Sequence, residues 1–407
     1  MPKSSAGSTG LAVLFAGFFL IDFDLVVINP LLLPIAEDFG VGLGTVTFAL
    51  TAYLLLFGAM QPVHGSLSDT VGRVKVMRIA LLGLGAGNLI AAAAPNVAVV
   101  IAGRAVAGAF GAAMIPLTLA YIGDRVAPQQ RQRAMAGLLA SGAVGGGLAT
   151  ILAGLLTDLV SWRPAVLLVG LAAPVLALLY GRLPETVTVA AGGPGALRRI
   201  GAVSRGGWFR FLLVFTFVEG AAMLGFFNFF NAALQADGRS VVVAGVVTGS
   251  YGLAALAGGA LVGLIETRVS QAAMFAIGGT LLFAGFAVAA YSQSLGGILA
   301  ASVLAGMALS LGQSTIQTWG VEVAAPGTLG TVASLVACAV FTGAAVGTAA
   351  VTGLANAGDF GTLFAIAAAV TLPVTVVGAL ARARFARSTA TDGPATLDTE
   401  AVALDSQ

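Results

Sequence analysis

The stretch Gly-Ser-Leu-Ser-Asp-Thr-Val-Gly-Arg-Val-Lys, residues 65–75, is a short polar segment between two long apolar ones. The flanking runs, 45–64 and 77–94, each approach the roughly 20 residues that a helix needs to cross a bilayer. Glycines permit a tight turn, and the carboxylate of Asp69 can pair with an arginine or cap a helix N-terminus. Basic residues favour the cytoplasmic surface of a membrane. We therefore expect a cytoplasmic loop that joins two membrane-spanning helices.

The composition is that of a chain whose solvent is lipid. Hydrophobic residues make up 58% and charged residues 9% of the 407 residues, whereas soluble domains have about 45–50% and about 25%. Because unpaired backbone groups are very costly in lipid, the long apolar runs must be helices. The sequence predicts an all-α membrane protein with twelve spans, at 11–36, 45–64, 77–94, 98–122, 134–157, 163–182, 208–234, 241–263, 271–292, 296–318, 328–354 and 361–382.

The basic residues indicate the orientation of these spans. If both termini are cytoplasmic, sixteen of the 19 lysines and arginines lie inside, Arg163 and Arg239 lie outside, and Arg104 lies within a span. This excess on one side predicts a multi-pass protein of the cell membrane with both termini in the cytoplasm.

The chain is expected to consist of two pseudo-symmetric six-helix halves. The longest internal polar stretch, 183–207, reads as a cytoplasmic linker between an N-terminal half, 1–182, and a C-terminal half, 208–382, and residues 383–407 read as a disordered cytoplasmic tail. Spans that start at residues 98 and 163 recur at 296 and 361, a shift of 198 residues. Two such repeats imply a central site between the halves, near the bilayer midplane.

Four charged side chains lie inside predicted spans: Asp22, Asp24, Arg104 and Glu219. Each costs about 2.5–3.5 kcal/mol at a helix centre on insertion scales, so each is a functional candidate by default. Asp22 and Glu219 are 197 residues apart, which places acids at near-equivalent positions of the two halves. Residues 22 and 24 lie about 200° apart on a helix, so both cannot face one cavity. One of them is expected at the membrane surface or against a neighbouring helix.

These acids are candidates for proton uptake and release. Removal of water favours the neutral form of a carboxyl group, which allows it to exchange a proton. A guanidinium stays charged, so Arg104 can bias a nearby acid toward ionisation without titrating itself. The alternative is a structural ion pair with Arg104, or a position of the acid at the membrane surface.

Aromatic and amide side chains in the spans are candidates for a substrate cavity. An aromatic wall with an acid nearby suits a lipophilic substrate, including a cationic one, although packing against lipid is the alternative for most of these phenylalanines. The predicted cavity residues are Asn29, Phe226, Asn228, Phe230, Asn231, Gln313 and Gln317. Asn29 precedes a proline, which predicts a kink near the outer end of the first span.

Three motifs resemble those of the major facilitator superfamily of secondary transporters. The first is the loop signature, carried by Gly65, Leu67, Asp69, Gly72, Arg73 and Lys75. The second is Arg104 followed four residues later by Gly108, where the family links the arginine to proton coupling. The third is the Gly-rich signature of the family's antiporters, which Gly145 and Gly154 match, whereas Ala149 and Thr150 occupy its Gly-Pro positions.

The resemblance covers residues 11–382 and is greatest to the twelve-helix proton-coupled drug and metabolite efflux proteins. It implies alternating access, with inward proton movement driving a small lipophilic compound out of the cell. In that reading Gly65, Asp69, Gly72 and Arg73 form a conformational gate that locks the outward-facing state. Proton exchange would involve Asp22, Glu219 and Arg104, with Asp24 as a further candidate.

Two alternatives remain open at this level: a proton-coupled importer of a small polar nutrient, and a non-transporting membrane sensor. The resemblance implies a transporter rather than an enzyme, with a small-molecule substrate, protons and the bilayer as partners, acting as a monomer. The single cysteine, Cys338, excludes an internal disulfide, and no metal-ligand cluster, phosphate-binding loop or other cofactor site is visible. The net charge of +2 gives no nucleic-acid footprint.

Overall fold

The computed structural model describes residues 8–186, 206–324 and 328–391, and in these ranges the regular structure is helical. Twelve helical segments of the described chain are long and apolar enough to cross a membrane, which confirms the predicted number. The N-terminal half contains α1 (Ser8–Val27), η1 (Asn29–Leu31), α2 (Leu32–Phe39), α3 (Leu43–Val71), α4 (Arg73–Ala92), α5 (Val97–Gly111), α6 (Met114–Arg125), α7 (Pro128–Leu159) and α8 (Arg163–Tyr180). The C-terminal half contains α10 (Gly207–Phe227), α11 (Phe230–Ala236), α12 (Val241–Ile265), α13 (Gln271–Tyr291), α14 (Leu295–Val323), α15 (Leu329–Ala350), α16 (Thr352–Asn356) and α17 (Phe360–Thr391).

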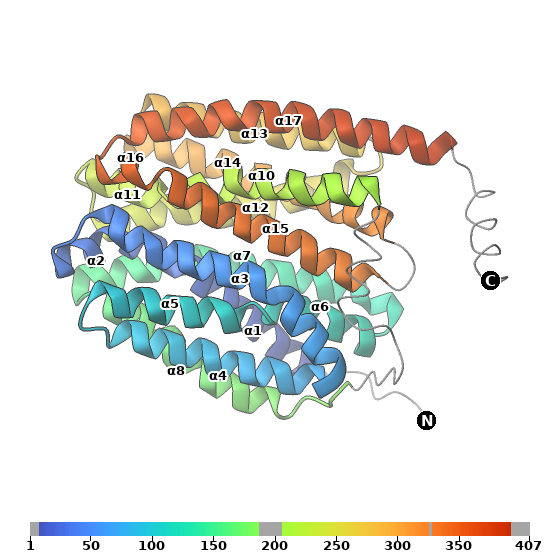
Figure 1. Ribbon diagram of the computed structural model, residues 1–407, viewed down its shortest axis with the longest axis horizontal. Helices are drawn as coiled ribbons and strands as arrows, with labels where there is room; N and C mark the ends of the chain where they lie inside the picture. Colours follow the sequence, from blue (N-terminus) through green and yellow to red (C-terminus); the bar gives the residue numbers. More distant parts are fainter. Residues whose placement is uncertain (1–7, 187–205, 325–327, 392–407) are drawn as a thin grey trace.

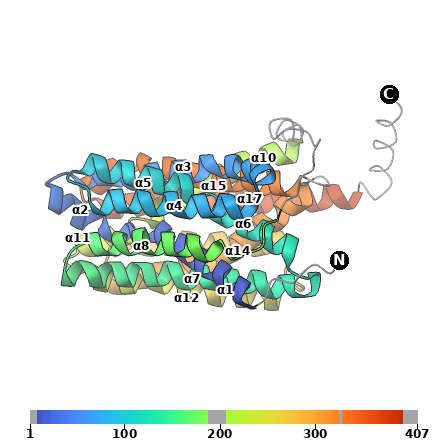
Figure 2. The same ribbon diagram turned by 90° about the horizontal axis from the view of Figure 1, so that it is seen from below.

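The long helices run along the long axis of the molecule, with the blue-to-green half beside the yellow-to-red half (Figure 1). The view from below shows the same near-parallel arrangement (Figure 2). The start of α1 and the end of α17 lie at one end of the bundle, which we call the termini end, and the short helices α2, α11 and α16 lie at the far end. The halves are joined where α3 packs on α15 and α7 packs on α12, and we call these two contacts the seam.

The polar segment 65–75 is not the loop that the sequence predicts. Helix α3 continues through it to Val71, α4 begins at Arg73, and Gly72 alone stands between them with φ of 107°. Ser66 and Ser68 donate their hydroxyl hydrogens to backbone carbonyls three residues earlier. These bonds satisfy the hydroxyls within the helix, although they do not by themselves favour it.

Four predicted spans are broken rather than continuous, and the eleventh span breaks at Val351, between α15 and α16. The first breaks at Asn29 and Pro30, as the predicted kink requires, and the seventh breaks at Asn228, between α10 and α11. The fourth breaks between α5 and α6, where Pro116 lacks the N–H that would bond to the carbonyl of residue 112. Breaks at this depth are tolerated where the freed backbone is buried in protein.

The predicted linker and tail fall partly outside the described residues, which include 183–186 and 206–207 of the linker and 383–391 of the tail. Residues 383–391 differ from the expected disorder, because they extend α17 as a helix to Thr391. Phe385 explains the extension, since it is 5% exposed and packs against Trp208 and Trp319. The division into halves at 182 and 208 stays a prediction.

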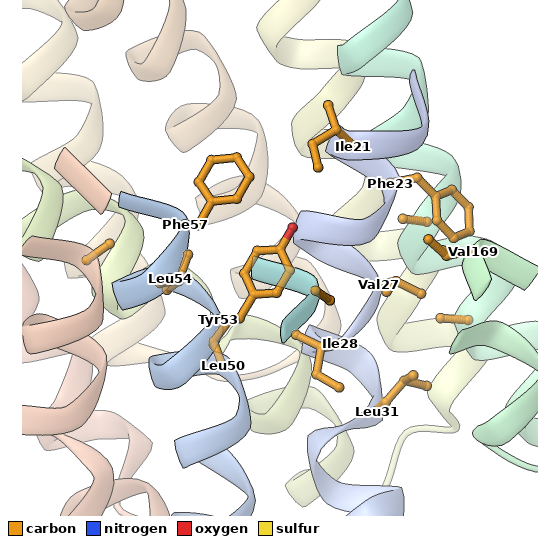
Figure 3. Close-up of a cluster of buried hydrophobic side chains, with 14 of the residues drawn as sticks. Ile21, Phe23, Val27, Ile28, Leu31, Leu50, Tyr53, Leu54, Phe57 and Val169 are labelled. Carbon is orange, nitrogen blue, oxygen red and sulfur yellow. The ribbon is translucent and has the colours of Figure 1, made fainter. Parts of the chain in front are cut away.

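In the core of the N-terminal half, α1 packs mainly against α7 and also against α8, and Tyr53 of α3 reaches toward it. Phe23 and Val27 of α1 and Tyr53 and Phe57 of α3 are almost fully buried, with the hydroxyl of Tyr53 directed toward α1 (Figure 3). Val169 of α8 completes this layer. This apolar packing fixes the rotation of α1, and with it the directions of the two aspartates that α1 carries.

Candidate functional site

Asp24 and Arg104 form a fully buried ion pair in the interior of the N-terminal half. Arg104 Nη1 donates to Asp24 Oδ1 at 2.6 Å, and Nη2 donates to the backbone oxygen of Asp24 at 2.8 Å. Nη1 also donates to Asn88 Oδ1 at 2.9 Å, and the guanidinium lies 4.1 Å from the centre of the Tyr53 ring. Both charged side chains are 0% exposed. The carboxylate of Asp24 therefore neutralises a buried arginine, which is the alternative that the sequence left open.

Asp22 points away from this ion pair, as the 200° separation predicts. Its side chain is partly buried, and its Oδ2 lies so close to Gly142 of α7 that a Cβ there would overlap it. Tyr251 of α12 lies within electrostatic range of Asp22. Since α7 and α12 meet in the seam, Asp22 lies beside the seam, and no described basic side chain pairs with it.

Glu219 lies inside the C-terminal half. It is 6% exposed, and its Oε2 is buried without a hydrogen-bond partner among the described residues. It borders a pocket whose other walls come from α13, α14 and α17. The three acids therefore occupy three separate surroundings, one in each half and one beside the seam.

The helix breaks correct the expected equivalence of Asp22 and Glu219. Asn29 and Asn228, at which the two spans break, are 199 residues apart and bond to one another. A shift of 199 residues aligns Glu219 with Leu20 rather than with Asp22. Leu20 lies four residues before Asp24, so these two residues share one face of α1. Glu219 thus faces the interior of its half, as Asp24 does, because a shift of two residues reverses the face of a helix.

The amides predicted to line a cavity instead bond to other side chains in the structure. Asn29 Nδ2 donates to Asn228 Oδ1 at 3.0 Å, and Asn228 Nδ2 donates to Thr348 Oγ1 at 3.4 Å. Thr248 Oγ1 donates to Asn231 Oδ1 at 3.0 Å. These three asparagines are at most 7% exposed. The bond between Asn29 and Asn228 joins the two halves directly.

The other predicted cavity residues are not gathered around these amides. Phe226 and Phe230 are buried in the core of the C-terminal half, with ring centres 6.2 and 6.0 Å from that of Phe286. Gln313 is partly buried and Gln317 is exposed. The phenylalanines therefore form neither a cavity wall nor a lipid-facing surface, because their rings fill the interior between helices.

Among the described residues, the hydrogen bonds between the halves lie toward the far end. Further hydrogen bonds between them run from Gln235 Nε2 to Pro30 O, from Thr150 Oγ1 to Gly245 O, from Gly44 N to Asn356 Oδ1 and from Val242 N to Asp158 Oδ2. Near the termini end, four glycines of the seam helices face open space, so that a Cβ there would meet no atom within 4 Å: Gly65, Gly259, Gly263 and Gly330. These glycines make no close contact between helices at that end, unlike Gly58, Gly154 and Gly245 farther along the seam.

The signature segment, residues 65–75, is held in place by Glu185, a residue that the sequence analysis did not single out. Both oxygens of Glu185 accept hydrogen bonds from the start of α4, from Val74 N at 2.9 Å and Lys75 N at 3.0 Å. A carboxylate at a helix N-terminus is stabilised by the free N–H groups and the helix dipole. Gly72 makes room for it, because a Cβ would lie 2.7 Å from Glu185 Cδ.

The predicted gate residues lie together where α3 ends. Arg73 Nε donates to Asp124 Oδ2 at 2.7 Å, which ties the signature to the end of α6 within the N-terminal half. Gly65 and Asp69 lie on α3, and the side chain of Asp69 lies outside the described residues. The gating role of this group stays a prediction.

Gly145 and Gly154 of α7 serve two different contacts. Gly145 lies against the backbone of Phe19 in α1, whereas Gly154 lies against α12, where a Cβ would be 2.6 Å from Val242 Cα. Small residues allow membrane helices to approach this closely. Thr150, which replaces the proline of the family signature, donates its hydroxyl hydrogen across the seam to Gly245 O at 2.8 Å.

Some residues of the site gave weak signals in the sequence. Asn88 was visible as an amide inside an apolar span, but Tyr53, Tyr251 and Thr348 carry no charge and look like ordinary span residues. Glu185 was hidden in the predicted linker. Within the described ranges, no group of three or more His, Cys, Asp and Glu side chains could hold a metal ion.

Comparison with known proteins identifies the family. The sequence model of the Major Facilitator Superfamily matches residues 14–238, more than half of the chain. The chain belongs to the Major Facilitator Superfamily. Its twelve spans and its family make it a multi-pass membrane protein, with the fold of transporters rather than enzymes.

Curated relatives in the superfamily include drug-resistance proteins. The chain is 34% identical over 178 residues to the puromycin resistance protein pur8 of Streptomyces alboniger, a match that covers 43% of this chain and 35% of that protein. It is 32% identical over 178 residues to the multidrug efflux pump LfrA of Mycolicibacterium smegmatis, covering 43% of this chain and 35% of the pump. The matched segments thus span about a third of each relative.

A solved structure resembles the fold over nearly its whole length. It is a bacterial homologue of the human lysosomal transporter Spinster in an inward-facing, unoccupied conformation. The TM-score is 0.72 at 16% identity, over 93% of this chain and 97% of the homologue. At this identity the likeness establishes the fold alone.

Proposed function

We propose that this protein is a proton-coupled exporter that exchanges protons for a small lipophilic compound by alternating access between its two halves. It acts as a monomer in the cell membrane, with both termini in the cytoplasm. The family supports transport, and the names of the two relatives, a puromycin resistance protein and a multidrug efflux pump, support export. The excess of basic residues on the termini side supports the orientation.

The observation that carries the proposal is the contrast among the three acids of the spans. Asp24 is paired with Arg104, whereas neither Asp22 nor Glu219 has a described basic partner. An unpaired carboxylate is costly in a low-dielectric interior, and neutralisation by a proton removes that cost. Asp22 and Glu219 are therefore the proton-exchanging groups, and Asp24 and Arg104 act on them through the positions of α1 and α5.

In alternating access the protein closes at one end of the bundle at a time, and different helices would close each end. With the termini in the cytoplasm, closure at the far end is what an inward-facing state requires. The Asn29–Asn228 bond and the Gly154 contact hold the far end closed. In the outward-facing state the signature residues Gly65, Asp69, Gly72 and Arg73 would close the termini end instead.

An importer of a polar nutrient uses the same fold, and it is supported by the incomplete signature of the fifth span and by the amides of the seventh and tenth spans. In the structure Asn228 bonds to Asn29 and Asn231 bonds to Thr248, so neither presents a free amide to a polar substrate. This bonding favours the exporter.

Proton flux in proteoliposomes tests the proposal. Vesicles with a pH-sensitive dye inside would be challenged with tetraphenylphosphonium, puromycin and a set of small polar nutrients. We expect lipophilic compounds to trigger proton movement in the wild type, and Asp22→Asn and Glu219→Gln to abolish it. Glu266→Gln is the matched control, because Glu266 is an exposed acid at the end of α12.

Each result of this experiment decides between the readings. Movement triggered only by polar nutrients would replace the exporter with an importer. Flux that is equal in the wild type and both variants would remove Asp22 and Glu219 from the mechanism. A wild type that moves no protons with any compound would favour the non-transporting sensor.

A further inference from the structure

The pocket beside Glu219 is built from one half of the protein only. Its twelve lining residues come from α10, α13, α14 and α17, and Glu219 is the only ionisable residue among them. Gly312 leaves space open on the α14 side, since a Cβ there would meet no atom within 4 Å, whereas Gly278 and Gly279 allow α14 and Thr375 to approach α13 closely. About 30 Å³ is available to the centres of water molecules, and one water needs about 10–15 Å³.

The polar groups of the pocket suit water beside a carboxyl group. Thr371 Oγ1 donates its hydrogen to Ala367 O at 2.8 Å, and Thr375 Oγ1 donates its hydrogen to Thr371 O at 2.8 Å. Each hydroxyl therefore has only lone pairs left to offer, which a water molecule can use as acceptors. With Glu219 these are the only polar side chains in the lining, too few oxygens for the six or so ligands of a divalent metal ion.

The pocket lies among four helices of the C-terminal half and draws no lining residue from the N-terminal half. Helices α12 and α15, which make the seam contacts of the C-terminal half, contribute no lining residue either. Asp22, in contrast, lies beside the seam against Gly142. The charged and titratable groups around Glu219 are few: none of the other lining residues ionises, and Tyr251 of α12 lies within electrostatic range of both Glu219 and Asp22.

We propose that the Glu219 pocket is a hydrated proton-binding site inside the C-terminal half, separate from the path of the substrate. The proton binds to a carboxylate oxygen of Glu219, and the resulting O–H donates to a water molecule that in turn donates to the threonine hydroxyls. Substrate therefore does not displace the proton from Glu219. The two are coupled through movement of α10, whereas Asp22 can exchange its proton directly for a substrate at the seam. This inference rests on the proposed proton coupling.

Infrared difference spectroscopy tests the site without measuring transport. Protein in lipid films would be exchanged between alkaline and acidic buffer, and the carbonyl stretch of protonated carboxyl groups recorded. We expect one component to be lost in Glu219→Gln and another in Asp22→Asn. With excess tetraphenylphosphonium, the Glu219 component should remain while the Asp22 component falls.

A pair of glycine variants on one helix tests the water. Gly312→Ala adds a methyl group that meets no atom within 4 Å and fills roughly the volume of one water molecule, about 30 Å³. It should shift the Glu219 component to higher frequency, because the carboxyl group loses a hydrogen bond. Gly320→Ala, also on α14 but outside the pocket lining, should leave the component unchanged.

Three results would overturn the inference. They are the absence of any Glu219-dependent component, its loss on addition of tetraphenylphosphonium, and equal spectra for the two glycine variants. A protein that shows the component but moves no protons in vesicles would refute the exporter and leave the site intact, so the two failures are distinguishable.

Discussion

Two aspartates that are two residues apart on α1 should respond in opposite ways to the same substitution. Asp24→Asn leaves the guanidinium of Arg104 buried without a counter-charge, and removal of one partner of a buried ion pair costs about 3–5 kcal/mol. The asparagine keeps an oxygen for Nη1, and the backbone oxygen of residue 24 still accepts from Nη2. We therefore expect the lower end of the range, about 3 kcal/mol.

Asp22→Asn should change the free energy of unfolding by less than about 1 kcal/mol, because no ion pair or hydrogen bond to its side chain is described. Its effect should fall on proton coupling. Asp24→Asn, in contrast, should retain coupling per folded molecule, since Asp24 neutralises Arg104 rather than exchanging a proton.

Both quantities can be measured on the same preparations. Unfolding by dodecyl sulfate in mixed micelles, followed by tryptophan fluorescence, gives the stability difference, and dye-loaded vesicles give the proton flux per folded protein. The double variant Asp24→Leu with Arg104→Met supplies an internal control, because replacing both members of a buried pair by apolar residues is often close to neutral. It should recover most of the stability that Asp24→Asn loses.

An Asp24→Asn protein as stable as the wild type would refute the assignment of the ion pair as structural. Loss of coupling at unchanged stability would do so too, and would move Asp24 into the proton pathway. If the double variant is no more stable than Asp24→Asn, the unpaired charge of Arg104 is not the cause of the lost stability.

Two further substitutions test the seam and the signature segment. Gly154→Val should push α7 away from α12, because even a Cβ at this position would lie 2.6 Å from Val242 Cα. The distance between spin labels at the far ends of the two helices should then increase, and an unchanged distance would contradict the closed seam. Gly72→Ala should destabilise the protein by about 1–3 kcal/mol in the same unfolding assay, since Gly72 has φ of 107° and borders Glu185. Gly65→Ala, where the Cβ is free, is the control and should be neutral or slightly stabilising, so equal losses in both variants would refute the Glu185 cap.

The motifs of the chain predicted its family correctly but not their own conformation. The signature segment was expected as a loop, and it is helical except at Gly72, with the hydroxyls of Ser66 and Ser68 bonded within the helix. The partner of that segment, Glu185, lies 110 residues after Lys75. A contact over such a separation leaves no local pattern in the sequence.

The candidate site shows the same limit. The sequence identified all four charged residues of the spans, because a charge in an apolar run is visible without any knowledge of the fold. It could not decide which aspartate pairs with Arg104, and it matched Glu219 to Asp22 rather than to the face of Asp24. A difference of two residues turns a side chain to the other side of a helix, and the register is visible only once the breaks at Asn29 and Asn228 are seen.

By itself the sequence determined the fold class, the twelve spans and the set of buried charges, because bilayer thickness and the cost of unpaired backbone in lipid act on each segment separately. Tertiary structure alone decided the pairing of Asp24 with Arg104, the closure of the seam toward the far end and the enclosure of Glu219 within one half. Those features depend on how each helix is rotated against its neighbours. That rotation is set by side-chain packing such as the contact of Tyr53 with α1, which hydropathy does not encode.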